Sequence, residues 1–459
     1  MATDEIRHIS PDENNPRYWS HGTDTRLLLG GSWQDNPFNH PMNLETHLDL
    51  LTSVGGNYLR NVMSHRNEGN VYPYAREGEK FDLDQFNQEY WDRLERFLEL
   101  TVERNIIVQI EIWATWDHYE DHQSRGGWSY HPYNPDNNVT YSPEESGLPT
   151  EIDYPPSSEP TEHPFFRTIP ALDDNDLVRR YQTEFVDALT DRTFEYPNVL
   201  YCMNNETGEH LEWGDFWIEY LHNRAADRGV DIYTTDMRRN EDVTASDHDH
   251  IYDNPDKYTF VDISQNNAWE GKGQQHYDNI CYVMERTASP PRPVNNVKNY
   301  GAIRHGEDES VARFCRIVFA GCASARFHRP HPIEDPAKHE TKSDVGLGLS
   351  PRAQCVIQSM RELTDRIDLR AASPAPDRLS NREPNEAYVL ANPPEEYALY
   401  FPDGGAVTLD IQESTGAFRE SWIEIDTAEW TDPVVRDGTA TLDIESPGSG
   451  HWGVVLSSA

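Results

Sequence analysis

Lysine is scarce in this 459-residue chain: six of its 39 basic residues are lysine, against 80 aspartates and glutamates. The acidic residues are spread along the sequence and give a formal net charge of −41. Such a surface repels nucleic acid and anionic membranes, so we expect neither as a partner. Self-repulsion at this charge destabilises a compact state unless salt screens it. We therefore expect a halophilic protein, and an aromatic content of 11% argues against the alternative, a disordered acidic chain.

Cysteine is also sparse, and its five copies are scattered without a CxxC pair. That pattern favours reduced, mostly buried thiols and predicts no zinc ribbon. No apolar run is long enough to span a membrane, and the N-terminus lacks the basic and apolar segments of a signal peptide. We expect a cytoplasmic protein, with a secreted mature form as the alternative. The sequence does not indicate an oligomeric state.

Signals for a bound cofactor are weak. Gly346 and Gly348 alone are too short a match to a phosphate-binding loop. Segments 117–122 and 247–253 are dense in possible ligands, but in so acidic a chain they are more simply explained as solvated surface. We therefore expect no cofactor and no metal.

One short apolar run ends abruptly in polar residues. It begins at Val199, after a proline and an asparagine, and leads into Asn204, Asn205 and Glu206. This pattern predicts a buried parallel strand that becomes polar where it emerges. In a (β/α)8 barrel the C-terminal ends of the strands carry the chemistry. We expect Glu206 to be a catalytic carboxyl group at that end, the alternative being a Glu that caps the next helix.

Strand and helix patterns alternate along most of the chain, which predicts an α/β fold, a (β/α)8 TIM barrel. The expected strands lie at 27–33, 57–64, 106–113, 199–206, 230–236, 258–265, 294–298 and 323–328. The expected helices lie at 42–54, 83–101, 176–193, 213–228, 277–288, 308–321 and 351–370. Helical spacing in 277–288 places Glu285 on a helix surface and excludes it as a strand-end acid.

The chain is expected to form two domains. Residues 1–372 would form the barrel, with an N-terminal hairpin and a long loop at 117–170 that roofs the active-site face. A Pro-rich linker follows, and residues 377–459 then switch to period-two patterns with Gly turns, which predicts an antiparallel β-sandwich. We expect this sandwich to be a structural module, with sugar binding as the alternative.

Several side chains are expected to line the barrel mouth. Alternation in the third strand turns Gln109, Glu111 and Trp113 inward. An unpaired interior Glu111 is costly, so either a structural pair with Arg60 or a catalytic role would explain it. The residues expected to contact substrate are Trp33, Arg60, Trp113, Trp116, His118, Asn205, Asp262, Gln265, Lys298 and His328. Aromatic residues of the long loop, such as Trp128, Tyr130 and Tyr133, could stack on sugars or pack the loop itself.

These residues resemble a family. Asn205-Glu206 at the fourth strand end, Arg60 on the second and the aromatic third strand end resemble the barrel glycoside hydrolases of clan A. The segment 15–19 (Asn-Pro-Arg-Tyr-Trp) resembles their apiosidase-like branch, and segments 400–410 and 447–452 are similar to a sandwich labelled a collagen-binding domain. The resemblance implies a glycosidase that cleaves O-glycosidic bonds of an oligo- or polysaccharide. Glu206 would be its general acid/base, and Asn205 would hold the sugar 2-hydroxyl.

One position departs from that family. The clan has a nucleophilic Glu at the end of strand seven, where this chain has Lys298, and His328 stands near a common Trp position. Glycoside hydrolysis generally needs two carboxyl groups. By strand-end position the second would be Asp236, then Glu111, then Asp262, and retention or inversion stays open.

Lys298 leaves further alternatives open. It could bind an acidic or sulfated sugar, or neutralise Glu206 or Glu111. A lysine at a strand end can also form a Schiff base with a carbonyl substrate, which would make the protein a lyase or aldolase. Loss of the strand-seven Glu could instead mark a barrel that binds carbohydrate without cleaving it.

Overall fold

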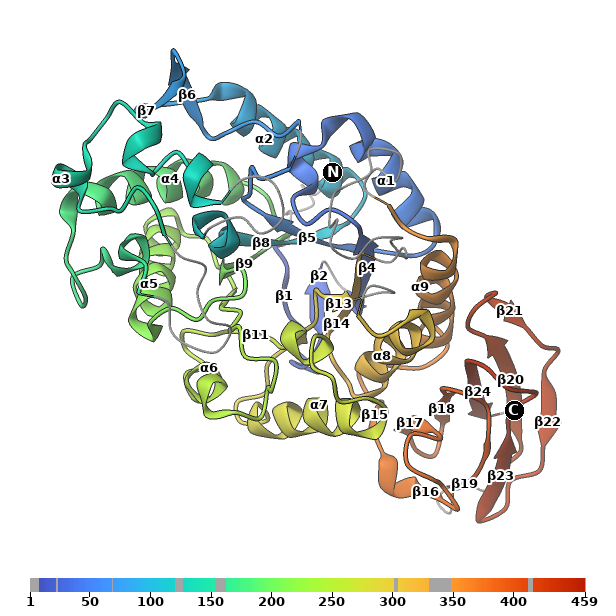
Figure 1. Cartoon of the computed structure of the whole chain (residues 1–459). Helices are drawn as coiled ribbons and strands as arrows, with labels where there is room; N and C mark the ends of the chain where they lie inside the picture. Colours follow the sequence, from blue (N-terminus) through green and yellow to red (C-terminus); the bar gives the residue numbers. More distant parts are fainter. Residues whose placement is uncertain are drawn as a thin grey trace.

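The computed structural model describes residues 8–21, 24–67, 69–119, 127–152, 162–300, 304–329, 348–411 and 416–458. Parallel strands form a central ring with helices outside it (Figure 1). In chain order the barrel strands are β4 (Leu28–Ser32), β5 (Tyr58–Val62), β8 (Ile107–Trp113), β9 (Val199–Asn204), β10 (Thr234–Thr235), β11 (Val261–Asp262), β12 (Val294–Asn295) and β14 (Ser324–His328). This architecture confirms the predicted (β/α)8 barrel.

The barrel strands pair in two runs. One sheet has the order β10-β9-β8-β5-β4-β14-β13, where β13 is Asn299–Tyr300, and β11 pairs with β12. Backbone hydrogen bonds link the runs: Phe260 N donates to Thr234 O at 3.5 Å, and Ala323 N donates to Val294 O at 2.8 Å. The carboxyl ends of all these strands therefore meet at one end of the ring.

Amphipathic helices cover the outside of the ring. They are α1 (Pro41–Ser53), α2 (Gln88–Glu103), α4 (Asp176–Thr193), α5 (Leu211–Arg228), α6 (Asp249–Asp253), α7 (Gln274–Arg286), α8 (Glu307–Phe319) and α9 (Pro351–Thr364). Glu285 is exposed on α7, as predicted. None of the described helices is long and apolar enough to cross a membrane. All five cysteines are free, and three of them are buried.

Several predicted bounds were wrong. Helix α2 begins at Gln88, because Asn87 caps it by accepting a hydrogen bond from Glu89 N at 3.2 Å. The residues before it form β7 (Lys80–Phe86), where buried Phe81 and Leu83 alternate with more exposed neighbours, and β7 pairs with β6 (Tyr74–Glu77). Strands β10, β11 and β12 are each two residues long, and α9 ends at Thr364 instead of residue 370.

A small N-terminal sheet plugs the ring opposite the strands' carboxyl ends. It consists of β1 (Ser10–Pro11), β2 (Trp19–His21) and β3 (Asp24–Arg26), one strand more than the predicted hairpin. The fully buried Trp19 packs edge-on against Tyr233 and Phe260 and donates from Nε1 to Asn295 Oδ1 at 2.9 Å. The plug thus leaves the carboxyl ends of the strands as the site of chemistry.

The long segment after β8 forms short turns and one short helix. They are η2 (Thr115–His118), η3 (Trp128–Tyr130), η4 (Pro135–Asn137), α3 (Pro143–Ser146) and η5 (Pro164–Arg167). Further short 3-10 turns are η1 (Pro37–Asn39), η6 (Ser246–His248), η7 (Ser264–Asn267) and η8 (Pro376–Arg378).

The C-terminal strands form two antiparallel sheets with their own core, which confirms the predicted sandwich. One sheet contains β15 (Ser373–Pro374), β17 (Tyr388–Asn392), β18 (Glu396–Phe401), β20 (Phe418–Glu424), β21 (Glu429–Trp430), β22 (Val434–Arg436) and β24 (Trp452–Ser458). The other contains β16 (Leu379–Ser380), β19 (Ala406–Asp410) and β23 (Thr441–Glu445). The predicted linker therefore already contributes β15 to the sandwich.

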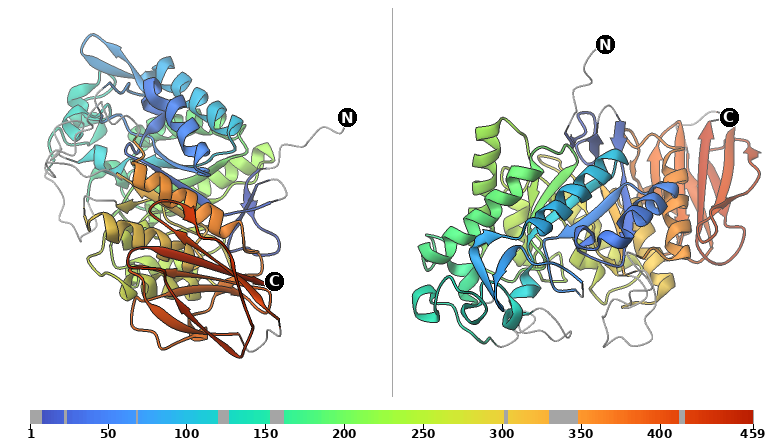
Figure 2. Two further views of the ribbon diagram at one scale, coloured as in Figure 1. Left: turned by 90° about the vertical axis from the view of Figure 1, so that its right-hand side faces the viewer. Right: turned by 90° about the horizontal axis from the view of Figure 1, so that it is seen from above.

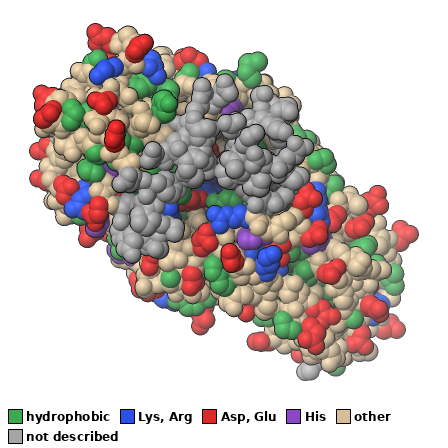
Figure 3. Space-filling model, viewed as in Figure 1, with side chains coloured by type: hydrophobic (Ala, Val, Ile, Leu, Met, Phe, Trp, Pro, Cys, Tyr) green, Lys and Arg blue, Asp and Glu red, His purple; other side chains and the backbone are tan. Residues whose placement is uncertain are grey.

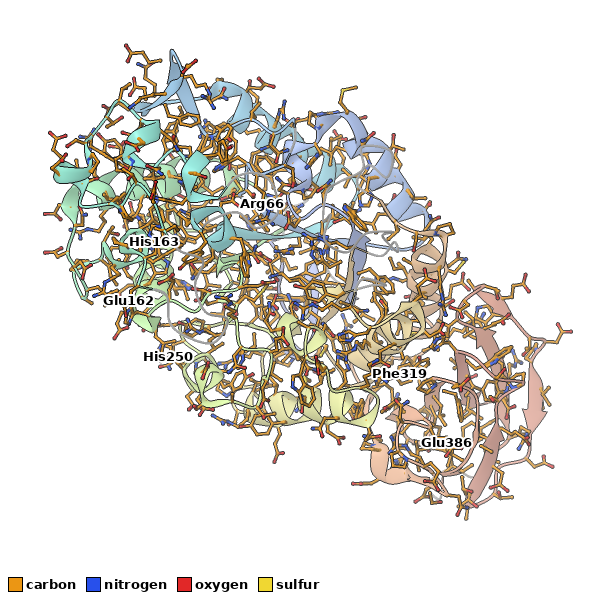
Figure 4. The ribbon with its side chains drawn as sticks, in the orientation of Figure 1. Arg66, Glu162, His163, His250, Phe319 and Glu386 are labelled. Carbon is orange, nitrogen blue, oxygen red and sulfur yellow. The ribbon has the colours of Figure 1, made fainter. Side chains whose placement is uncertain are left out.

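The sandwich packs against α8 and α9 at one side of the barrel (Figure 2). Phe319 lies at this junction in Figure 4, and its ring centroid is 5.7 Å from that of Tyr400. Arg352 of α9 donates to both carboxylate oxygens of Asp426 at 2.8 and 3.0 Å. These contacts support the structural role expected for the sandwich.

Candidate active site

Glu206 is the second residue after the end of the buried strand β9. Backbone hydrogen bonds fix the residues on either side: Asn205 N donates to Trp113 O at 3.0 Å, and Thr207 N donates to Met237 O at 2.8 Å. Between them Glu206 has a φ of 58°, in the left-handed region. A residue with a Cβ adopts that region at a cost of roughly 1–3 kcal/mol, and such residues cluster at functional sites.

Three donors hold the Glu206 carboxylate. Lys298 Nζ and Tyr300 OH both donate to Oε1, the tyrosine at 2.9 Å, and Trp116 Nε1 donates to Oε2 at 2.8 Å. The Glu206 side chain is 14% exposed, whereas Lys298 is 1% exposed. Glu206 therefore lies at a partly open mouth above a buried ammonium group.

Charge at this mouth keeps Glu206 ionised. Burial alone raises a carboxyl pKa, but Lys298, and after it Arg60, hold the pKa of Glu206 well below its usual range. Burial lowers the pKa of Lys298, and Glu206 partly offsets that effect. In this state Glu206 is a carboxylate and carries no proton to donate.

A buried ion pair lies beside Glu206. Arg60 donates from Nε and Nη2 to the two oxygens of Glu111 at 2.5 and 2.8 Å. Arg60 Nη2 and Lys298 Nζ also donate to Asn205 Oδ1, at 2.9 and 2.6 Å. Glu111 thus has the Arg60 partner that one of its two expected roles requires, and Asn205 links this pair to the Lys298–Glu206 pair.

Asp236 and Glu206 are not brought together. Asp236 Oδ1 accepts hydrogen bonds from Asn204 N at 3.0 Å, Asn204 Nδ2 at 2.9 Å and Met237 N at 2.9 Å. Its Oδ2 is so close to α5 that a Cβ built on Gly214 would lie 2.7 Å away. Burial raises the pKa of Asp236 despite these donors. Its side chain thus faces the helix ring, where it orders the ends of β9 and β10.

Asp262 belongs to a polar layer that reaches the N-terminal plug. It accepts hydrogen bonds from Gln109 Nε2 at 2.7 Å and Ser264 N at 2.8 Å. Tyr58 OH donates to Gln109 Oε1 at 2.6 Å and accepts from Asn295, which also binds Trp19. Burial raises the pKa of Asp262 to about 6.

The aromatic and polar residues expected to contact substrate fall into two groups. The first group, Trp116, Gln265 and His328, lies around Glu206 and Tyr300. Trp116 binds Glu206, the guanidinium of Arg239 lies over the Trp116 ring at 4.9 Å, and Gln265 is close enough to Glu206 to help lower its pKa. His328 packs edge-on against Tyr300 with ring centroids 5.2 Å apart.

The second group lies outside the shell around Glu206. Trp113 is 3% exposed and packs on Phe165, Phe185 and aromatic residues of α5, so its predicted inward orientation is wrong. His118 is buried between His131 and Phe165, each with ring centroids 4.1 Å away. Trp33, Trp128 and Tyr133 are also buried, whereas Tyr130 is 58% exposed. Most of these aromatic rings therefore pack the loop and the helix ring.

Several residues of the mouth were missed in the sequence. Arg66 forms ion pairs with Asp35 and, at 3.0 Å, with Asp117 (Figure 4). Tyr300 holds Glu206, and Arg326 of β14 donates to Val297 O at 2.7 Å and to Ser32 Oγ. Two sequence signals could have identified them. Asp35 follows the first barrel strand, and Arg326, two residues before His328, lies on the same face of its strand as His328.

Among the described residues, no three His, Cys, Asp or Glu side chains come together to hold a metal ion. The chemistry that this site offers is that of a carboxylate, an ammonium group and hydrogen-bonding amide, phenol and indole groups.

Comparison with family models and with curated protein sequences gave no match. Solved structures share the fold. The glycoside hydrolase family 5 protein from Bacteroides vulgatus ATCC 8482 is 14% identical with a TM-score of 0.65, over 98% of this chain and 93% of that chain. A second structure, described as a glycoside hydrolase, is 14% identical with a TM-score of 0.65, over 99% and 97% of the two chains.

A third structure, the maltogenic α-amylase AmyB from Thermotoga neapolitana, is 9% identical with a TM-score of 0.53, over 94% and 99% of the chains. Identities this low establish the fold alone. The chain therefore has the barrel-plus-sandwich fold of glycoside hydrolases along nearly its whole length.

Proposed function

We propose that this protein is a glycoside hydrolase that cleaves O-glycosidic bonds of an oligo- or polysaccharide at Glu206. One observation carries the proposal: Glu206 is 14% exposed, whereas Glu111, Asp236 and Asp262 are 0%, 3% and 3% exposed. Of the four expected carboxyl groups, Glu206 is thus the most exposed at the mouth. Its strand-end position and its left-handed backbone add support.

The ion pair with Lys298 limits the form in which Glu206 can act. A general acid must hold a proton, and the resting Glu206 is held as a carboxylate. As it stands, Glu206 is ready to act as a base or a nucleophile. It becomes a proton donor once Lys298 is drawn away from it. The proposed general acid/base role therefore requires the Lys298–Glu206 ion pair to open.

The test is the release of reducing ends from a glycan panel by the full chain. We expect Glu206→Gln to lower the rate by about 10²–10⁴-fold, the usual contribution of an acid–base group. Its melting temperature should fall, because glutamine leaves the buried Lys298 without its counter-ion, so both rates are measured well below the melting temperature of the variant. The control, Glu89→Gln, removes a carboxylate that is 60% exposed on α2 and should leave the rate unchanged. Full turnover by Glu206→Gln would remove the assignment.

A barrel that binds carbohydrate without cleaving it is a second candidate. Lys298, which contacts Glu206 directly, stands where a second carboxylate is expected, and Glu111, Asp236 and Asp262 are held by other donors. Binding without any product across the panel would favour this function.

A Schiff-base lyase is a third candidate, favoured by the lowered pKa of Lys298. The contacts of Lys298 with Glu206 and Asn205 oppose it, because they hold the lysine as an ammonium ion. Borohydride trapping of a carbonyl substrate on Lys298 would decide for the lyase.

A further inference from the structure

Basic side chains of the described residues gather at the barrel mouth, although acids outnumber bases two to one in the whole chain. The basic residues are Arg60, Arg66, Lys298, Arg326 and Arg329. The carboxylates that pair with them are Asp35, Glu111, Asp117 and Glu206. Figure 3 shows Lys and Arg atoms at the centre of this face and Asp and Glu atoms scattered over its margins.

Arg326 has no carboxylate partner among the described residues. It is fully buried, and its partners are the neutral Val297 O and Ser32 Oγ. A buried charge without a counter-ion is strongly disfavoured, and such residues often mark a binding site. Burial, and after it repulsion by Arg60, lower the pKa of Arg326 to about 9, so the residue keeps its charge at neutral pH.

Three buried nitrogens at the mouth have no hydrogen-bond acceptor among the described residues. They are Arg60 Nη1, Arg326 Nε and His328 Nδ1. Arg60 and His328 are only 1% and 3% exposed, and buried polar groups are normally satisfied. Arg60 Nη1 is 3.8 Å from Asp35 Oδ2, too far for a hydrogen bond. Arg60 Nη1 and Arg326 Nε are therefore donors ready for an acceptor that a ligand would bring, and the neutral ring of His328 lies beside them.

The surroundings of His328 point to a negatively charged ligand. Burial, and then the charges of Arg329, Arg60, Arg326 and Lys298, hold the pKa of His328 well below its usual range. The charges that act most strongly on His328 thus come from four basic residues. An anion beside His328 would relieve this repulsion.

We propose that the sugar entering this mouth carries a carboxylate or a sulfate ester, held by Lys298, Arg60 and His328. The inference rests on the proposed function of the barrel as a carbohydrate site and names the substrate class. The acidic outer surface repels such a ligand from every other face, so the mouth also provides selectivity.

An anionic sugar would also allow Glu206 to take up a proton, although Lys298 holds Glu206 as a carboxylate in the resting site. Its charge competes with Glu206 for the Lys298 ammonium group, and Glu206 then takes up a proton from solvent. Glu206 becomes a proton donor only when the charged substrate is in place.

The experiment compares matched ligand pairs by isothermal titration calorimetry on the full chain at constant ionic strength. One pair is a galacturonic acid hexamer and its methyl-esterified form. The other is a sulfated galactose hexamer and its desulfated form. We expect the charged member of one pair to bind at least about tenfold more tightly than its neutral partner. The pair that shows the difference identifies carboxylate or sulfate as the recognised group.

Two lysine variants of the same chemistry test the site. Lys298→Met should abolish the preference for the charged ligand. Lys257→Met removes the same charge from the outer surface, where Lys257 pairs with Asp215, and should keep the preference. Should Lys298→Met fail to fold, the wild-type comparison decides alone. Equal affinity within both pairs, preference for the neutral members, or no binding of either charged ligand would overturn the inference.

Proton uptake gives a readout that a purely structural role of His328 would not move. Binding of the charged ligand should take up protons and tighten as the pH falls, because the anion raises the pKa of His328 and of Glu206. Reducing ends measured in the same samples separate the two proposals. Cleavage of the neutral ligands alone would support the hydrolase and overturn the anionic substrate. Tighter binding of a charged ligand without cleavage would support the anionic ligand and overturn the hydrolase.

Discussion

At the scale of single residues, the mouth contains a buried network of two charge pairs linked by an amide. The bidentate pair of Arg60 and Glu111 is almost completely buried, and Asn205 connects it to Lys298 and Glu206. Removing one partner of such a pair leaves the other charge buried and alone. The role of Glu111 can therefore be tested through stability.

We expect Glu111→Gln to lower the free energy of unfolding by about 3–5 kcal/mol, because it leaves Arg60 without its counter-ion. The measurement is urea unfolding at neutral pH. Glu89→Gln is the matched control and should cost less than about 0.5 kcal/mol, since it breaks an exposed pair with Arg93. A loss below about 1 kcal/mol for Glu111→Gln would contradict the structural role and return Glu111 to the catalytic candidates.

Sequence reasoning recovered part of this network. The cost of an unpaired interior charge made pairing with Arg60 one of the two roles expected for Glu111, and strand-end position placed Glu206 and Asn205 at the barrel mouth. The partner of Lys298 stayed open between two carboxylates, because local pattern does not give distances across a barrel. Asp35, Arg326 and Tyr300 were missed for the same reason: their contacts join strands that are far apart in the chain.

At the scale of elements, the predicted bounds were accurate where the apolar spacing is regular and a capping residue marks the end of the element. The bounds of α4 were predicted correctly, because its apolar spacing is regular and Asn175 caps its start by accepting from Val178 N at 3.2 Å. Strands β10, β11 and β12 were predicted too long, since an apolar run does not fix how many residues pair. The Trp113 side chain does not point inward as the alternation along β8 predicts, because it packs against aromatic residues of α4 and α5.

Four histidines form a buried layer: His65 follows β5, and His118, His131 and His163 come from the segment after β8. Ring centroids are 5.1 Å apart for His65 and His131 and 4.1 Å apart for His118 and His131. A cavity of about 30 Å³, the size of one water, lies among three of these rings. Burial lowers the pKa of His65 to about 4 and of His163 to about 3, and it holds the other two well below the usual range.

This histidine layer predicts acid sensitivity. A histidine whose folded pKa lies below its unfolded value near 6.5 stabilises the fold fully above that pH and loses the contribution as pH falls. Between pH 6.5 and 5 each such histidine should cost about 1.5 kcal/mol of unfolding free energy. Urea unfolding at several pH values in this range measures the slope.

The variant His118→Phe keeps the stacked ring and removes the titrating group, so the mean slope over this range should fall by about 1 kcal/mol per pH unit. His250→Phe, at a partly exposed pair with Asp215, is the control and should change the slope less. An unchanged slope in His118→Phe would contradict the role of the layer.

At the scale of the whole molecule, fold and charge are separate properties. The barrel and the sandwich follow from alternating patterns and are confirmed, whereas the halophilic character inferred from a net charge of −41 stays a prediction. Many arginines are already engaged in ion pairs with acids at the surface, as Arg96 is with Glu45 and Arg224 with Asp191. The remaining acidic excess has no cation to offset it and must be screened by salt.

We therefore expect the melting temperature to rise by several degrees between about 0.1 and 1 M KCl, as the Debye length falls from about 10 to 3 Å. Screening is nearly complete at 1 M, so the rise should then flatten, whereas ion exclusion from the surface would continue to raise the melting temperature with concentration.

The combined variant Glu144→Gln, Glu219→Gln, Asp227→Asn and Asp256→Asn removes exposed acids of α3, α5 and the turn after α6. It should melt higher than the wild type at 0.1 M and equally at 2 M, because it removes repulsion that concentrated salt already screens. Salt-independent melting of the wild type, or a variant that melts lower at 0.1 M, would contradict charge repulsion as the main force that destabilises this fold at low salt.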